Sequence, residues 1–189
     1  MRPRLLQTLA LALPLALVTP ADEGDALTRE PIIAGVRVFY GPEAGLERID
    51  VGLLAGARRA IDMAAYVLTN RAVIAALREA AQRGVRVRLY LDPDQRRDRR
   101  PDPMSALSLL IAEPNVETRY KAQSDEMMHL KAFQVDGRIL RTGSTNFSYA
   151  GARRQDNDIV VIESRRAAAE FIAAFEALWS RPDNERTRP

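Results

Sequence analysis

The chain has 189 residues, of which 47% are hydrophobic, and its 28 basic and 25 acidic side chains give a formal net charge of +3. It has no cysteine, which excludes disulfides and thiolate metal sites, so a packed hydrophobic core must supply the stability. A charge so close to balance does not by itself predict nucleic-acid binding, and the hydrophobic content is typical of a globular protein rather than a disordered one.

The N-terminal residues have the pattern of a secretory signal peptide. Arg2 and Arg4 precede an apolar run of 14 residues, and small residues around Ala21 provide a cleavage site. This run is shorter than the roughly 20 residues that a membrane-spanning helix needs, although an uncleaved anchor stays the alternative. We therefore expect residues 1–21 to be removed and the protein to be periplasmic or secreted. Without Arg2 and Arg4, 26 basic and 25 acidic residues leave a net charge of +1.

The remaining chain is predicted to form a linker at 22–35 and one domain at 36–182. Alternating apolar residues predict strands, and apolar residues three and four apart predict helices. The predicted strands are 36–40, 61–68, 85–91, 116–120, 127–135, 138–142 and 158–163, and the predicted helices are 46–60, 71–83, 105–111 and 165–179. The stretch from Asp92 to Pro103 has three prolines and no apolar residue, which is typical of an exposed loop. Strands alternating with helices favour an α/β fold, with a sheet sandwiched between helices.

The single histidine, His129, lies two residues before Lys131, one of only two lysines in a chain with 26 arginines. Within the strand predicted at 127–135, alternation puts both side chains on one face, roughly 7 Å apart. An imidazole can act as a nucleophile or carry a proton near neutral pH, and a lysine ammonium is a compact partner for phosphate. The pair favours chemistry on a phosphate group, whereas a histidine alone is more often structural and a lysine alone is more often a solvated charge.

A second polar group follows at residues 143–146. Gly143 permits a tight turn, and Ser144 and Asn146 offer neutral donors to a phosphoryl oxygen. Asp136 and Gly137, which lie between the two groups, are the residue pair of a type I′ hairpin turn, so we interpret Asp136 mainly as a turn residue. By itself this second group is an ordinary turn, but with the histidine and the lysine it predicts a phosphate cradle with a nucleophile.

The order His-x-Lys-x4-Asp-x6-Gly-Ser-x-Asn resembles the signature of the phospholipase D superfamily. In this chain it comprises His129, Lys131, Asp136, Gly143, Ser144 and Asn146. The stretches VRVFYGP, IDMAAYVLTN and VRVRLYLD are also similar to the N-terminal half of that family. The likeness covers about residues 36–180 and is greatest to the family's small secreted bacterial endonucleases. It implies an α/β fold with a mixed β-sheet between helices.

In that family a histidine attacks phosphorus to form a phosphohistidine, a second motif's histidine protonates the leaving oxygen, and water hydrolyses the intermediate. The resemblance therefore implies that His129 is the nucleophile and that Lys131, Ser144 and Asn146 act with it and, together with Gly143, bind the phosphate. It implies no metal and no cofactor. Because the chain has one motif and no internal repeat, it also implies a homodimer with the active site at the two-fold interface.

The family places an acidic residue after the motif, where it orients the nucleophilic histidine. Ungapped alignment puts Asn157 at that position in this chain, between Asp156 and Asp158. An asparagine can accept a hydrogen bond from the ring but stabilises an imidazolium less than a carboxylate does. A shift of one residue would bring a neighbouring aspartate such as Asp158 into that role.

The substrate class stays open at this point. The arginine-rich run 96–100, together with Arg153 and Arg154, favours a nucleic-acid backbone, and the alternative for the run is a solvated loop. Met127 and Met128 offer an apolar contact to lipid, although methionine is as common as a core residue. We expect a non-specific endonuclease acting on DNA or RNA. The alternatives are a phospholipase D or cardiolipin-type lipid hydrolase, and a non-catalytic phosphate-binding module.

Overall fold

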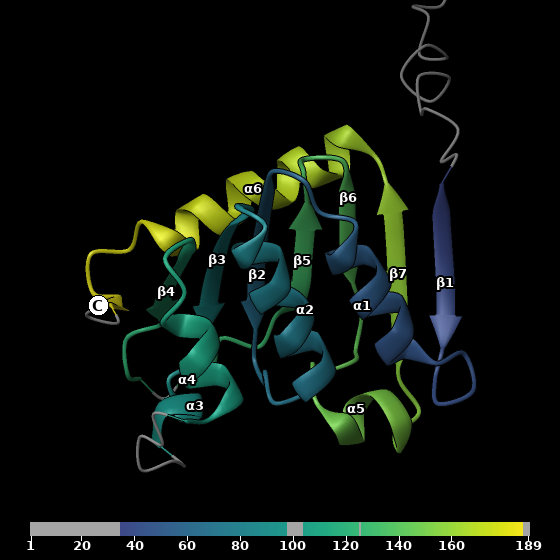
Figure 1. Ribbon diagram of the computed structural model, residues 1–189, viewed down its shortest axis with the longest axis horizontal. Coiled ribbons are helices and arrows are strands. Elements are labelled where there is room, and N and C mark those ends of the chain that lie inside the picture. The colour runs from purple at the N-terminus through teal and green to yellow at the C-terminus, as the bar shows by residue number, and fades with distance from the viewer. Residues whose placement is uncertain (1–34, 98–103, 125, 187–189) are drawn as a thin grey trace, which may run out of the picture. The chain divides into compact units, whose positions relative to one another are not determined.

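The computed structural model describes residues 35–97, 104–124 and 126–186, so the predicted signal peptide and nearly all of the predicted linker lie outside the described residues. The described chain forms an eight-stranded sheet with the order β1-β7-β6-β5-β2-β3-β4-β8 (Figure 1). Its strands are β1 (Val36–Tyr40), β2 (Ala60–Ala65), β3 (Arg86–Leu91), β4 (Val116–Tyr120), β5 (Lys131–Val135), β6 (Ile139–Thr142), β7 (Asp158–Glu163) and β8 (Glu185–Arg186). The helices are α1 (Leu46–Ala55), α2 (Arg71–Gln82), α3 (Asp94–Arg97), α4 (Ala106–Ile111), α5 (Tyr149–Arg153) and α6 (Arg165–Trp179).

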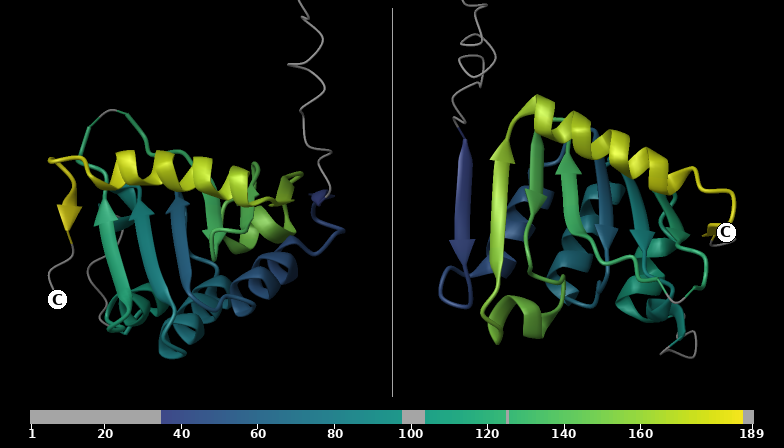
Figure 2. Two further views of the ribbon diagram at one scale, coloured as in Figure 1. Left: turned by 90° about the horizontal axis from the view of Figure 1, so that it is seen from above. Right: turned by 180° about the vertical axis from the view of Figure 1, so that it is seen from behind.

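Helices cover both faces of this sheet. α1, α2 and α4 lie on one face, and α6 crosses the other (Figure 2). The larger core fills the first interface and includes Met63 and Phe133, while Tyr90, Phe175 and Trp179 form a smaller core under α6. β2, β3 and β4 are parallel and the remaining pairs are antiparallel. The predicted α/β fold, a mixed sheet between helices, is confirmed.

The capping signals of α2 act as predicted. The Asn70 side chain accepts hydrogen bonds from the backbone N–H groups of Ala72 and Val73, which have no partner inside the helix. The helix ends just before Gly84, whose φ of 89° is readily adopted only by glycine. The prediction of this helix is confirmed to within one residue at its end.

The predictions for α1 and β2 were too long at their C-terminal ends. α1 ends at Ala55 rather than near Ala60, and Ala60 already belongs to β2. Ala57 continues the apolar spacing of the helix because it is buried in the core from the connecting loop. β2 likewise ends at Ala65, while Leu68 stays buried through an isolated bridge. Buried apolar residues in the following loops therefore made the predicted helix and the predicted strand longer than α1 and β2 are.

β3 is a strand as predicted, but its alternation does not divide it into a buried and an exposed face. Only Arg86 is exposed, because α6 covers Arg88 and Tyr90. Arg88 is held by an ion pair with buried Asp62, with 2.6 Å between Nε and Oδ1, and its guanidinium lies 5.3 Å from the Trp179 ring centroid. Arg88, which the alternating pattern of β3 would place on an exposed face, is therefore buried and held in an ion pair.

The β5–β6 hairpin has the predicted turn. Asp136 and Gly137 have φ values of 57° and 65°, as a type I′ turn requires at both central positions. The predicted start of β5 at residue 127 was wrong, because the strand begins at Lys131. Lys131 pairs with Ala65, the last residue of β2, so residues 127–130 have no neighbouring strand on that side.

The short elements α3, α5 and β8 were not predicted. α3 occupies the start of the loop predicted from Asp92 to Pro103, and residues 98–103 of that loop lie outside the described residues. Elsewhere, β1, β4 and β7 have the predicted bounds, and α4 and α6 agree to within one residue. Across the described ranges, no helix is long and apolar enough to cross a membrane.

Candidate active site

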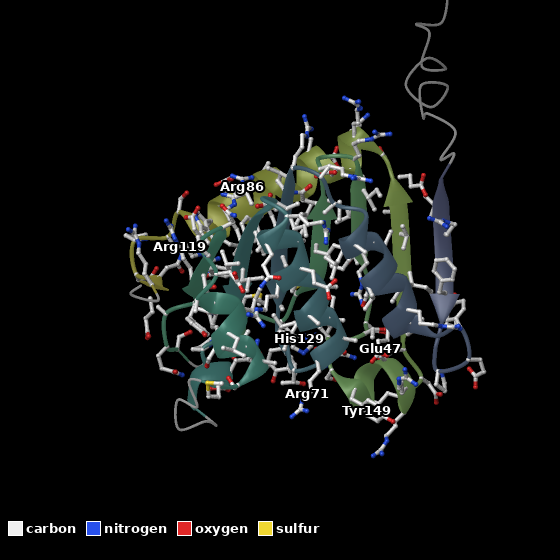
Figure 3. The ribbon with its side chains drawn as sticks, viewed as in Figure 1. Glu47, Arg71, Arg86, Arg119, His129 and Tyr149 are labelled. Carbon is white, nitrogen blue, oxygen red and sulfur yellow. The ribbon has the colours of Figure 1, made fainter. Side chains whose placement is uncertain are left out.

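Most of the predicted motif gathers at one edge of the sheet. β2 and β3 end at this edge, whereas β5, which is antiparallel to β2 and β6, begins there. We call it the motif edge and define it by His129, Lys131 and residues 143–146. Figure 3 shows His129 at this edge, which is the lower edge in that view.

His129 lies in the extended segment just before β5 and its side chain is exposed. Its ring packs against Tyr66, the residue after β2, with 4.5 Å between the ring centroids and an interplanar angle of 57°. The Tyr66 N–H donates to the carbonyl oxygen of Leu130 over 2.9 Å, which fixes this tyrosine to the segment that carries the histidine. The same-strand geometry predicted for His129 and Lys131 was wrong, but both groups contact one aromatic ring.

Lys131 is the buried member of the pair, with 8% of its surface exposed. Its Nζ donates to the backbone carbonyl oxygen of His129 over 2.8 Å and lies 5.0 Å from the Tyr66 ring centroid. Burial lowers the pKa of the Lys131 ammonium below its ordinary value. Among the described residues no carboxylate pairs with it, so its charge is available to an anionic ligand.

The segment just before the histidine is anchored from β3. Asp92, which follows β3 and is 1% exposed, accepts a hydrogen bond from the Met128 N–H over 2.8 Å. Met128 itself is buried in the core under α6, whereas Met127 is 59% exposed. Met128 therefore fixes the segment in the core, whereas the side chain of Met127 lies at the protein surface.

Gly143 and Ser144 form the start of a loop locked to β7. A Cβ atom at Gly143, whose φ is 140°, would come within 2.5 Å of the Asp158 carbonyl oxygen, so this position requires glycine. The Ser144 hydroxyl donates to the Asp158 carboxylate over 2.5 Å and accepts from the Asp158 N–H over 2.9 Å. Asp158 thus supports Ser144, the predicted phosphate-binding residue, and does not bond to His129 in the described structure.

Asn146 has a buried side-chain oxygen, Oδ1, with no hydrogen-bond partner among the described residues. Such groups are uncommon in folded proteins, and each calls for a physical explanation. The next residue, Phe147, fixes the loop because its carbonyl oxygen accepts from the N–H groups of Thr69 and Asn70, each over 2.8 Å. Because Oδ1 is a buried acceptor, it cannot bind a phosphate oxygen, and the Nδ2 donor is the atom of Asn146 that is suited to phosphate.

A buried ion pair that the sequence did not reveal connects the two halves of the motif. Arg141 of β6 is fully buried and binds both oxygens of Asp50 of α1, over 2.7 and 2.8 Å. Its Nη1 also donates to the carbonyl oxygens of Lys131 and Thr145, over 2.8 and 3.3 Å. Burial raises the pKa of the Asp50 carboxyl, and the Arg141 charge opposes that rise. One guanidinium therefore holds the lysine strand and the asparagine loop together.

Asp136 is the one motif residue that does not lie at the motif edge, because it follows the opposite end of β5. Its carboxylate accepts hydrogen bonds from the backbone N–H groups of Arg58, Arg59 and Ala60 over 2.8–3.0 Å. Burial alone would raise the pKa of Asp136, but these bonds and the Arg59 charge lower it below the ordinary value. Asp136 is a turn and anchoring residue, as the turn prediction had it.

Asn157 holds the loop after α5 rather than the histidine. Its Nδ2 donates to the carbonyl oxygen of Gly151 over 3.0 Å and to Oε1 of Gln155 over 3.2 Å. In the described part of the chain no hydrogen bond joins it to His129, so an orienting role stays a prediction. The side chain in contact with the imidazole is Tyr66, which sequence reasoning missed because an aromatic residue at a strand end is usually a core residue.

Positive charge and an aromatic ring lie along the motif edge at α5. The Arg153 and Arg154 guanidinium groups lie 5.7 and 5.3 Å from the Tyr149 ring centroid, and Tyr149 is 54% exposed. Arg153 also pairs with Glu47 over 2.6 Å, which lowers the pKa of that carboxyl. The predicted arginines at 96–100 have side chains outside the described residues. Across the described ranges, no group of three or more His, Cys, Asp or Glu residues is placed to hold a metal ion.

Residues 51–179 match the protein-family model described as cardiolipin synthase, phospholipase D-like domain. The chain belongs to this phospholipase D-like family. It is 25% identical to the phospholipase D family member Nuc from Salmonella typhimurium, whose crystal structure it matches with a TM-score of 0.68 over 82% of this chain and 99% of that one. The family predicted from the motif is confirmed.

Curated relatives of the chain are longer than the part they share with it. The chain is 28% identical to a mitochondrial cardiolipin hydrolase of Chlamydomonas reinhardtii over 67% of its own length and 54% of that protein. It is 25% identical to a phospholipase D of Rickettsia prowazekii over 74% of its own length and 65% of that protein. The chain thus spans between half and two thirds of these relatives.

Proposed function

We propose that the protein is a metal-independent phosphodiesterase that forms a phosphohistidine at His129, and that its substrate is DNA or RNA. The observation that carries the proposal is an exposed imidazole beside the buried ammonium of Lys131, which has no carboxylate partner among the described residues. Membership of the phospholipase D-like family supports the reaction class. The signal-like residues 1–21 support an exported enzyme, periplasmic or secreted.

The proposed reaction has two steps. A ring nitrogen of His129 attacks phosphorus, so that an N–P bond forms while the P–O bond to the leaving group breaks. Lys131 and Asn146 bind the non-bridging oxygens, and a second histidine gives its proton to the leaving oxygen. Water then attacks phosphorus and passes a proton to that second histidine, and the N–P bond breaks to free His129.

The second histidine must come from another copy, because the chain has only one. We therefore propose a homodimer in which two motif edges meet across a two-fold axis. Met127 and Leu130 flank the histidine and are 59% and 44% exposed. Apolar side chains at this position support the proposal, since a second copy would cover them.

The arginine and tyrosine side chains at α5 support nucleic acid as the substrate. Arg153 and Arg154 lie against the exposed ring of Tyr149, and single strands are bound by arginines that follow the backbone and aromatic rings that stack on bases. The match to 99% of Nuc, a phospholipase D family member, supports the fold and the reaction class of the proposal rather than a particular substrate.

Phospholipid is the second candidate, and a different observation favours it. Met127 and Leu130 give the histidine exposed apolar neighbours, which would contact acyl chains if they were not covered by a second copy. The relatives named cardiolipin hydrolase and phospholipase D support this alternative. A non-catalytic phosphate-binding module is a third alternative, which an exposed histidine beside a buried lysine does not favour.

Plasmid nicking in excess EDTA tests the proposal. We expect the protein lacking residues 1–21 to nick the plasmid without added metal, and His129→Ala to lose nicking by at least about 1,000-fold, as removal of a nucleophile does. Arg166→Gln, an exposed substitution on α6, is the control and should nick normally. Loss of nicking by chelation would contradict the metal-independent mechanism. Inactivity on plasmid with hydrolysis of cardiolipin vesicles would replace nucleic acid by phospholipid.

A further inference from the structure

A concave site lies at the opposite edge of the sheet from the histidine. A pocket of about 540 Å³ is lined by the end of α1, the β5–β6 turn and the start of α6, including Gly52, Leu53, Arg58, Arg138, Ile139 and Arg165. β5 separates it from the motif edge, because Lys131 begins the strand and Val135, which also lines the pocket, ends it. Four residue steps of a strand correspond to roughly 14 Å, so this pocket is distinct from the candidate active site.

The charge of the pocket is positive. Arg58, Arg138 and Arg165 are exposed, and none of them forms an ion pair with any residue in the described part of the chain. The two acidic residues that line the pocket are already engaged: Asp136 accepts three backbone N–H groups, and Glu163 pairs with Arg37 over 2.7 Å. Three guanidinium groups around one cavity therefore form no ion pair among the described residues, and the two carboxylates that line the same cavity are bound elsewhere.

Gly52, which is exposed, contributes open space to the wall of the pocket. It lies inside α1, where glycine is less favourable than alanine. A Cβ atom built at Gly52 would meet no atom within 4 Å, so neither packing nor a close backbone approach requires glycine there. Because Gly52 lines the pocket, its missing side chain leaves that wall open.

The floor of the pocket is apolar. Val135 is buried, and Leu53 and Ile139 are half-buried residues that pack on the main core. A guanidinium fork suits phosphate oxygens, and an apolar floor suits a ring or a short hydrocarbon portion. We propose that this pocket binds a small organic phosphate, with the phosphate between Arg58, Arg138 and Arg165 and the rest of the molecule against Leu53 and Ile139. A volume of about 540 Å³ falls in the range of small-molecule sites.

Isothermal titration tests this site with adenosine 5′-monophosphate, glycerol 1-phosphate, inorganic phosphate and adenosine as probes. The titrations are made in His129→Ala/Lys131→Met protein, because the motif edge also attracts phosphate. We expect saturable binding of an organic phosphate, and weaker binding of inorganic phosphate and of adenosine. A stronger signal from the nucleotide indicates a nucleotide ligand, and a stronger signal from glycerol phosphate indicates a lipid headgroup. Both results support the site.

Substitutions in the pocket then locate the binding. In Arg138→Gln/Arg165→Gln the affinity should fall about tenfold or more, as it does when charged hydrogen bonds are removed. Gly52→Leu should abolish binding by filling the cavity. Gly52→Ala should raise the melting temperature while it weakens binding, which separates a blocked site from a misfolded protein. Arg166→Gln, next to Arg165 and paired with Glu170, is the matched control. Unchanged affinity in the pocket variants, or no saturation by any probe, would overturn the proposal.

Discussion

The two lysines of the chain are equally buried and differ in their partners. Lys121 and Lys131 are each 8% exposed. The Lys121 Nζ lies 2.5 Å from the Glu126 carbonyl oxygen and 3.5 Å from its carboxylate. Within the described part of the chain, the Lys131 Nζ instead contacts the His129 carbonyl oxygen and the Tyr66 ring. The sequence alone indicated Lys131 by its distance from the histidine. It did not indicate that the ammonium is buried with no carboxylate partner among the described residues, because burial depends on the neighbouring strands.

Lys131→Met should lower activity while it removes a buried charge that destabilises the fold at neutral pH. Activity should fall about 100-fold or more, since a charged donor to phosphate is lost. Because burial lowers the pKa of Lys131, the unfolded chain binds this proton more tightly, and the charged lysine destabilises the fold at neutral pH. Parent stability should therefore rise relative to Lys131→Met as pH increases from the lowered pKa to about 10.4, above which this titration changes it no further.

Urea unfolding at neutral and alkaline pH measures this effect. Lys121→Met is the matched control and should keep its activity, because that lysine contacts Glu126 rather than the motif edge. A Lys131→Met protein that retains parent activity would contradict the role of Lys131 in phosphate binding.

At the scale of elements, most helices and strands followed from local patterns, and the exceptions have tertiary causes. Asn70 and Gly84 mark α2 by their own chemistry, so its ends were predictable. The start of β5 was not, because it depends on where β2 stops at Ala65. Residues 143–146 were predictable as a motif, but the locking of Ser144 by Asp158 needs the β6–β7 pairing, which no local pattern encodes.

The Arg141–Asp50 ion pair joins α1 to β6 and fixes both segments of the motif. Asp50→Asn should lower the free energy of unfolding by about 3–5 kcal/mol, because it leaves the Arg141 charge buried without a full partner. The double variant Arg141→Met/Asp50→Leu should recover part of that stability, because it removes the buried charge but leaves two carbonyl oxygens without their donor. Its activity should stay low, because the carbonyl oxygens of Lys131 and Thr145 lose their shared donor.

Denaturant unfolding measures the stability of these variants, and kcat measured on the same preparations shows whether activity follows it. Glu170→Gln removes the exposed Arg166–Glu170 pair and should change stability by less than about 1 kcal/mol. A double variant with parent kcat would show that the ion pair contributes to stability alone.

At the scale of the whole molecule, one motif per chain makes the proposed reaction depend on association. Leu130→Glu puts a charge on an exposed apolar position beside the histidine and should convert a dimer to a monomer, with loss of activity. Val38→Glu, at a 47% exposed apolar position on the edge strand β1, is the control. Sedimentation equilibrium measures the oligomeric state of the two variants. An active monomeric Leu130→Glu protein would contradict a shared site, and dissociation by Val38→Glu alone would place the interface at β1.

The most direct measurement is a single-turnover reaction with bis(p-nitrophenyl) phosphate, stopped in alkali and analysed by mass spectrometry. We expect the nitrophenyl phosphoryl group to be bound to His129 while the first nitrophenolate is released, and the adduct to disappear as the second product forms. His129→Ala should show neither adduct nor release. Product release from the parent protein without an adduct on His129, or an adduct on another residue, would contradict the phosphohistidine mechanism.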